Sequence, residues 1–263
     1  MEICTAKVNG FEMDYFSFGT GGKVFVIIPG MSLRSVMLSA PAIAGQYRMF
    51  KEDFTVYVFD RRKNPPENYS IRDMAEDTAA VMKLLGIWDA YLFGASQGGM
   101  IEQCLAVYFP ELVHGMVIAS SYCRPNEKSQ AIFERWIALA KEHNVPALNH
   151  DFFLSIYSDE FLEKNAEALP IVEKQGTAEE CENLIIFSKA CMNFDFYDSL
   201  EKINCPVLVT GATGDKVLTG ESSEEMASKI RNCELYMYDS DAHAIYDEAP
   251  DYCERLMKFY KSI

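Results

Sequence analysis

Short apolar runs alternate with helical patterns along much of this chain, and that alternation limits the folds it can adopt. Residues 24–28 are continuously apolar and stop at Pro29-Gly30, as expected for a strand covered on both faces. Between residues 73 and 85 apolar positions recur at helical spacing before Gly86. Because strands separated by helices pair in parallel, we predict an α/β fold, with a mostly parallel central sheet flanked by helices. Further strand-like runs are residues 55–59, 90–93, 113–119, 206–210 and 234–238.

The two ends of the chain carry different patterns. Residues 3–8 and 11–18 have strand-like patterns and are separated by Asn9-Gly10, which predicts a β-hairpin. Residues 250–261 have the spacing of an amphipathic helix. We therefore expect the sheet to begin with a hairpin and the chain to finish on a helix.

The alternation breaks between residues 124 and 200. Helical patterns such as 129–142 and 178–192 follow one another there with no clear strand between them. This indicates a helical insertion into the α/β unit. The predicted domains are an α/β core formed by residues 1–123 and 200–263, and a helical cap formed by residues 124–199.

One motif carries the chemistry. The apolar run that ends at Phe93 is followed by Gly94-Ala95-Ser96-Gln97-Gly98-Gly99 and then by a helical pattern over residues 100–109. G-x-S-x-G between a strand and a helix is typical of a sharp, strained turn that exposes a nucleophilic serine, and its glycines avoid collisions two residues either side. Since the following helix directs N–H groups at the reacting centre, we predict Ser96 to be a nucleophile.

A serine nucleophile needs a base and an orienting acid. His243 lies in a polar loop beyond the last predicted strand, where catalytic groups of parallel sheets gather. The other histidines, His114, His143 and His150, are explained as surface or satisfied polar residues, although either of the insertion histidines, His143 or His150, could line a pocket. Asp215 directly follows the predicted strand 206–210 and is the best candidate acid, with Asp241 as the alternative.

The order Ser96, Asp215, His243 is the chain order of the nucleophile-elbow hydrolases. On these residues the whole chain resembles an alpha/beta-hydrolase-fold serine hydrolase with a helical cap, similar to the small esterase and carbon–carbon bond hydrolase branch. The resemblance implies an oxyanion loop at Pro29-Gly30-Met31-Ser32, with the backbone N–H groups of Met31 and Gln97 as donors.

Substrate-binding residues are harder to assign. Gly30 and Ser32 belong to the implied oxyanion loop, and Trp136 is one of many aromatic residues in the insertion that could roof an apolar pocket. Pro29 stands where many relatives carry histidine. A basic loop, Asp60-Arg61-Arg62-Lys63-Asn64-Pro65-Pro66, replaces the glycine-bearing loop common in relatives, so Arg62 or a neighbour could bind an anionic substrate group, or pair internally with Asp60.

The predicted function is serine hydrolysis through an acyl-enzyme, on a small to medium ester-like carbonyl substrate. Cleavage of a carbon–carbon bond, hydrolysis of a lactone or amide, and acyl transfer use the same triad and stay open. A ligand receptor that keeps the triad but turns over negligibly is a further alternative.

Charge and composition exclude several partners. The net charge of −15 disfavours nucleic acid and anionic membranes, and the eight cysteines lack the spacing of a metal site. No G-x-G-x-x-G opens a helix, so no nucleotide is expected. We expect no cofactor and no metal, and, since no signal peptide or membrane-spanning run is visible, a soluble cytoplasmic protein acting on a small molecule. The sequence makes no prediction of oligomeric state.

Overall fold

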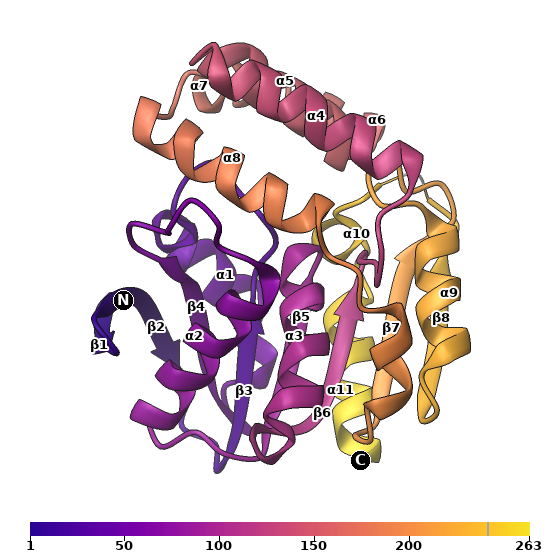
Figure 1. The fold of residues 1–263 in the computed structure, drawn as a ribbon. Helices are drawn as coiled ribbons and strands as arrows, with labels where there is room; N and C mark the ends of the chain where they lie inside the picture. Colours follow the sequence, from indigo (N-terminus) through magenta and orange to yellow (C-terminus); the bar gives the residue numbers. More distant parts are fainter. Residues whose placement is uncertain (241) are drawn as a thin grey trace.

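The protein is built on one eight-stranded sheet, seen in a computed structural model that describes residues 1–240 and 242–263 (Figure 1). The strands lie in the order β1-β2-β4-β3-β5-β6-β7-β8. Their bounds are β1 Cys4–Val8, β2 Phe11–Phe18, β3 Lys23–Ile28, β4 Phe54–Arg62, β5 Ala90–Ala95, β6 Val113–Ala119, β7 Val207–Ala212 and β8 Cys233–Tyr238. The predicted strands are all present, with ends shifted by a few residues at most.

Most neighbouring strands run parallel. β3 to β8 form the parallel part of the sheet, while β2 pairs antiparallel with both β1 and β4. Asn9 and Gly10 join β1 to β2 with φ values of 49° and 81°, the positive pair that a two-residue hairpin turn requires. The predicted hairpin and the predicted mostly parallel sheet are both confirmed.

Helices cover both faces of the sheet (Figure 1). One core lies on the side of α2, α3 and α9, and a second core lies on the side of α1 and α11. Because β5 and β7 are buried along their whole length between these layers, they consist of small and apolar residues. The core helices are α1 Ala40–Gln46, α2 Ile71–Leu84, α3 Gln97–Tyr108, α9 Gly220–Lys229, α10 Ile245–Glu248 and α11 Tyr252–Ser262, with short 3₁₀ turns η1 Val36–Ser39, η2 Arg48–Phe50, η3 Pro110–Leu112 and η4 Tyr197–Lys202.

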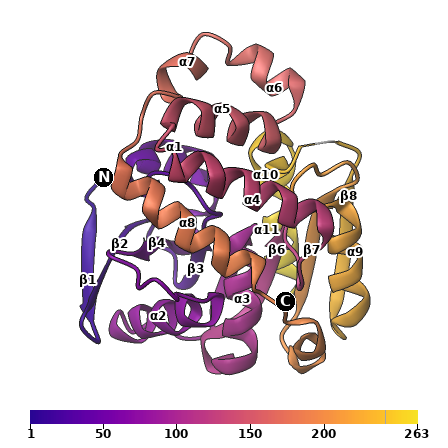
Figure 2. The ribbon, with the colours of Figure 1, turned by 45° about the horizontal axis from the view of Figure 1, so that its top comes forward.

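A helical insertion connects β6 to β7. Its helices are α4 Glu127–Lys141, α5 Val145–Ile156, α6 Asp159–Lys164, α7 Leu169–Val172 and α8 Ala178–Met192. Figure 2 shows α4, α5 and α8 lying across the sheet, with α6 and α7 farther out. α4 packs against both α8 and α5. The insertion therefore lies over the end of the sheet where the nucleophile is located.

The start of α2 and the end of β4 differ from the prediction. α2 begins at Ile71 because Ser70 and Asp73 form a capping box, two residues before the expected start. β4 continues to Arg62, which pairs with Met13 of β2, so Asp60 to Arg62 belong to a strand and not to the predicted loop. Across the described residues, no helix has the length and apolar character needed to cross a bilayer.

Candidate active site

Ser96 lies on a strained turn between β5 and α3. Its φ of 52° and ψ of −115° fall outside the regions that serine ordinarily adopts. A Cβ on Gly94 would lie 2.6 Å from backbone atoms of Gly98, and a Cβ on Gly98 would overlap the carbonyl oxygen of Ile28. The two glycines are therefore required by close backbone approach, as the motif predicts. The side chain of Ser121 supports the turn by donating to the Ser96 carbonyl at 2.8 Å.

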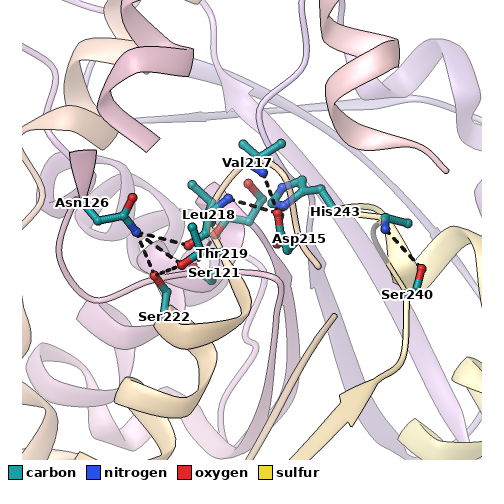
Figure 3. Close-up of polar contacts among 11 residues, drawn as sticks. Ser121, Asn126, Asp215, Val217, Leu218, Thr219, Ser222, Ser240 and His243 are labelled. Atoms are coloured by element: carbon teal, nitrogen blue, oxygen red, sulfur yellow. Dashed lines mark hydrogen bonds and ion pairs between the residues drawn. The ribbon is translucent and has the colours of Figure 1, made fainter. Parts of the chain in front are cut away.

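Asp215 and His243 form a buried hydrogen-bonded pair (Figure 3). His243 Nδ1 lies 2.8 Å from Asp215 Oδ2, and since an ionised carboxylate only accepts, Nδ1 is the donor. The other carboxylate oxygen accepts the backbone N–H groups of Val217 at 2.7 Å and Leu218 at 3.0 Å. Asp215 is thus fixed by its own loop, and His243 is left with Nε2 for reaction.

Asn126 connects the acid-bearing loop to the first cap helix. Its Oδ1 accepts from the backbone of Ser129 and caps α4, while Nδ2 donates to Ser222 Oγ at 3.2 Å and to the Leu218 carbonyl at 3.5 Å (Figure 3). The cap therefore begins against the loop that positions Asp215. Asp241, the alternative acid, lies outside the described residues.

Ser96 and His243 line one small cavity beneath the cap. Its volume is about 30 Å³, room for a single water molecule. Gly30 and Met31 bound it on the core side. Its other lining residues, most of them contributed by the cap, are Phe133, Trp136, Phe152, Ile156, Cys191, Val217 and Tyr246. The structure thus brings two of the three predicted catalytic residues to one cavity, with the third holding the histidine.

The two backbone segments implied as oxyanion donors also meet here. A Cβ on Gly30 would lie 3.3 Å from the Ser96 Cβ, so this loop reaches the nucleophile closely. α3 begins at Gln97, whose N–H belongs to the first turn and has no intrahelical acceptor. Met31 follows Gly30 and lines the cavity. This placement is compatible with the N–H groups of Met31 and Gln97 acting together.

Arg61 connects these two segments from behind. Its Nε donates to Gln97 Oε1 at 2.9 Å, and its Nη2 donates to the Pro29 carbonyl at 2.6 Å. Burial lowers the pKa of the Arg61 guanidinium and raises the pKa of the adjacent Asp60 carboxyl, which accepts from the Ser35 hydroxyl and the Arg61 N–H. Arg61 is therefore part of the framework of the site.

A larger cleft opens beside the triad cavity. Its volume is about 510 Å³, and it extends between the oxyanion loop, α1 and the cap helix α5. Ser32 lines it, and the Ser32 hydroxyl donates to the Arg34 carbonyl at 2.7 Å. The residues that line both spaces are Gly30, Met31, Phe152, Ile156 and Tyr246. The larger cleft therefore adjoins the cavity that Ser96 lines.

Trp136 and Arg62 have different surroundings. Trp136 lines the triad cavity and donates from its indole N–H to Asp151 at 2.9 Å. Arg62 instead forms an ion pair with Asp77 at 3.2 Å and stacks over Phe11, so its guanidinium is committed to the α2 side of the sheet. The substrate-binding role of Arg62 stays a prediction, with this internal pairing as the competing role.

Lys63, His114 and His150 each keep about a third or more of the side chain exposed. Lys63 forms an ion pair with Asp14 at 2.8 Å. His114 contacts Asp89 and His150 contacts Glu173, at 3.1 and 2.7 Å. Among the described residues, neither these two histidines nor their acidic partners line the triad cavity.

Several residues of the site were not identified from the sequence. Tyr246, Val217 and Ile156 line the triad cavity. Tyr246 follows His243 by only three residues, and this closeness along the chain could have suggested it. Ile156 ends α5, and its carbonyl accepts the N–H of Ala244 at 2.8 Å, a link between cap and catalytic loop that no local pattern reveals.

Comparison with known proteins gives the same fold. The chain is 24% identical to "Putative carbamate hydrolase RutD" of Caulobacter segnis over 267 residues, which cover 98% of each chain. The enol-lactonase of Burkholderia xenovorans superposes with a TM-score of 0.85 at 19% identity, covering 98% of this chain and 100% of its own. A thermophilic esterase of Thermogutta terrifontis superposes with a TM-score of 0.83 at 17% identity, covering 100% and 99%.

A family model extends over most of the chain. The model for the alpha/beta hydrolase fold matches residues 23–250, a span that contains Ser96, Asp215 and His243. The strand order, the strained serine turn and the helical insertion agree with that match. The chain belongs to the alpha/beta hydrolase fold family.

Proposed function

We propose that this protein is a serine hydrolase that cleaves an ester-like carbonyl substrate through an acyl-enzyme. The observation that carries the proposal is the buried pairing of His243 with Asp215 at 2.8 Å, beside a cavity that Ser96 and His243 line together. Ser96 occupies the strained turn typical of an exposed nucleophile. In this proposal Ser96 is the nucleophile, His243 the base and Asp215 the acid that orients the histidine, which are the three roles that acyl transfer needs.

In the proposed reaction His243 accepts the Ser96 proton while the serine oxygen attacks the substrate carbonyl. Asp215 holds the imidazole in the tautomer that leaves Nε2 free to accept that proton, and it stabilises the imidazolium that forms. His243 then gives the proton to the leaving group. Water repeats the sequence on the acyl-enzyme and releases the acid.

The N–H groups of Met31 and Gln97 stabilise the oxyanion in this proposal. Each donor belongs to rigid backbone, one in the loop after β3 and one at the start of α3. Fixed donors favour the transition state because they need no reorganisation when the charge develops. Arg61 acts as a positioning residue, since its hydrogen bonds hold both segments.

The helical cap, for which we propose the bounds 124–199, selects the substrate by size. Phe133, Trp136 and Cys191 close the small cavity over Ser96. With about 30 Å³ available, only a methyl-sized group fits on that side unless the cap moves. The larger cleft accepts the bulkier part of the substrate. We therefore expect short acyl groups, or short leaving groups, to react fastest.

Hydrolysis of a lactone or carbamate is the second candidate. It is supported by the activities named for the enol-lactonase and for the carbamate hydrolase relative. Both reactions use the same attack on a carbonyl and the same oxyanion donors. Amide hydrolysis, carbon–carbon bond cleavage and acyl transfer require the same triad.

The experiment is pre-steady-state and steady-state hydrolysis of p-nitrophenyl acetate, butyrate and octanoate, followed by a lactone and a carbamate. We expect a burst of nitrophenol equal to the enzyme concentration, then turnover, with acetate fastest. Ser96→Ala should lose both phases, and Ser228→Ala, which removes a hydroxyl from the exposed side of α9, should keep them. A burst without turnover would support the receptor alternative, and activity retained by Ser96→Ala would reject the proposal.

A further inference from the structure

The larger cleft is lined by aromatic rings. Phe152 and Phe153 of α5 and Tyr157, the residue that follows this helix, line it from the cap, and each is half-buried. Tyr246 faces it from α10, and Phe93 lies at its floor, with its ring 6.1 Å from that of Tyr246. Aromatic faces carry a negative quadrupole, so such a lining attracts organic cations as well as apolar groups.

A carboxylate lies among these rings. Asp247 lines the same cleft, and its side chain is accessible to solvent there. Gln46 Nε2 donates to Asp247 Oδ1 at 3.2 Å and to the carbonyl of Tyr246 at 3.0 Å, which holds the carboxylate in place. Loss of hydration within the cleft raises the pKa of Asp247 to about 6, against the opposing hydrogen bond from Gln46, so the group is mainly ionised at neutral pH. Its charge is therefore available to a ligand.

The cleft offers no free cation to neutralise that charge. Within the part of the chain that the structure describes, Arg34 is the only lysine or arginine that lines it. Arg34 donates to the Gln175 side chain and lies 4.0 Å from Glu180. The Arg34 guanidinium is thus engaged by two cap residues, and among the described residues it forms no ion pair with Asp247.

We propose that the larger cleft binds an organic ammonium group, so that the preferred substrates are esters carrying a quaternary or primary amine. This inference rests on the proposed hydrolase function and names the substrate class of that same site. Carboxylates and aromatic faces are the two kinds of partner that organic ammonium ions bind, and this cleft offers both. The same charge repels carboxylate-bearing esters.

The first test compares esters that differ only in charge. Acetylcholine and 3,3-dimethylbutyl acetate have the same shape with and without the cation on the alcohol side, and betaine ethyl ester and ethyl 3,3-dimethylbutanoate are the matching pair on the acyl side. We divide each kcat/KM by the rate constant for hydroxide-catalysed hydrolysis of the same ester, because the ammonium group also activates the carbonyl. We expect this ratio for the ammonium ester to exceed that of its neutral partner by at least tenfold in one pair. The pair that shows it identifies which half of the ester enters the cleft.

Variants assign the preference to the cleft. Asp247→Asn should reduce the ratio of the two kcat/KM values by about tenfold or more, and Tyr157→Leu should reduce it by a smaller factor. Asp159→Asn is the matched control. This substitution removes the same negative charge, but from an exposed carboxylate on the cap surface that does not line the cleft. Equal ratios in wild type and Asp247→Asn, or an equal loss in Asp159→Asn, would overturn the proposal.

A binding experiment separates this inference from the catalytic proposal. Ser96→Ala protein is titrated calorimetrically with choline and with its neutral isostere 3,3-dimethylbutanol. We expect choline to bind at least fivefold more tightly, and Asp247→Asn to abolish the difference. Preferential binding of choline without any ester turnover would keep the cation site and reject the hydrolase, whereas turnover without a charge preference would do the reverse.

Discussion

Arg61 Nε donates to Gln97 Oε1 at 2.9 Å, which joins β4 to the helix that begins behind the nucleophile. The same guanidinium donates to the Pro29 carbonyl at 2.6 Å, next to the loop that carries Met31. Gln97 Nε2 continues the connection by donating to the Phe187 carbonyl of α8 at 3.2 Å. The half-buried guanidinium of Arg61 therefore holds the two proposed oxyanion segments, and Gln97 connects them to the cap.

Arg61→Met should lower kcat more than it raises KM. Without the guanidinium the Pro29 and Gln97 acceptors lose their donor, and the two backbone N–H groups are no longer held together. A loss of about 10²-fold in kcat is expected, comparable to removal of one oxyanion donor. The measurement is kcat and KM on p-nitrophenyl acetate. Arg61→Lys, which keeps a cationic donor, should retain part of the kcat that Arg61→Met loses. An unchanged kcat in a folded Arg61→Met protein would show that the segments need no such support.

Asp215→Asn should abolish most of the activity while sparing the fold. The asparagine cannot hold the His243 Nδ1–H in the correct tautomer, and a loss of about 10⁴ in kcat is expected by analogy with other triads. The Val217 and Leu218 N–H groups keep an oxygen acceptor in this variant. Asp241→Asn is the comparison. If it lost more activity than Asp215→Asn, the assignment of the acid would be wrong.

The contrast between Arg61 and Arg62 tests the substrate role suggested by the basic run. Because Arg62 is paired with Asp77, we expect Arg62→Ala to leave the ratio of KM values for carboxylated and neutral esters unchanged. Thermal stability should fall, since the Asp77 carboxylate loses its partner. A selective rise in KM for the carboxylated ester would instead establish Arg62 as a substrate clamp.

Glu102 gives the protein a pH-dependent stability. Its carboxyl group is fully buried under the serine turn, where a Cβ on Gly94 would lie 2.6 Å from it, and it has no hydrogen-bond partner of normal geometry among the described residues. Burial raises the pKa of Glu102 well above its ordinary value near 4.5. The folded state therefore keeps a proton that the unfolded chain releases.

Because of Glu102, the free energy of unfolding should fall as pH rises. As pH rises above about 4.5, the unfolded chain loses the proton first, so the free energy of unfolding falls until the folded group also ionises. Glu102→Gln removes this loss, and its melting temperature relative to wild type should increase between pH 4 and pH 8. Glu254→Gln, on the exposed side of α11, is the control. A difference in melting temperature between Glu102→Gln and wild type that stays constant or falls between pH 4 and pH 8 would contradict this interpretation.

The features predicted well from the sequence were those that depend on short stretches of neighbouring residues. The apolar runs identify the strands, and Gly94 and Gly98 mark the serine turn because close backbone approach leaves no room for a side chain. Asp215 and His243 were placed through the rule that catalytic groups follow parallel strands, and the structure pairs them.

The parts that were missed depend on contacts distant in the sequence. Arg61 and Arg62 are adjacent in a basic run, but alternation along β4 sends one to Gln97 and the other to Asp77. That difference requires the strand to continue to Arg62, which pairing with β2 determines. Asp247 and the rings of α5 come together only when the cap is placed over the sheet.

Labelling with a fluorophosphonate probe, followed by peptide mass spectrometry, tests the proposed nucleophile most directly. We expect covalent modification of wild-type protein at Ser96, no modification of Ser96→Ala, and labelling slowed by orders of magnitude in His243→Ala. Absence of labelling in folded wild-type protein, or modification at another serine, would contradict the assignment of Ser96, Asp215 and His243 as a working triad.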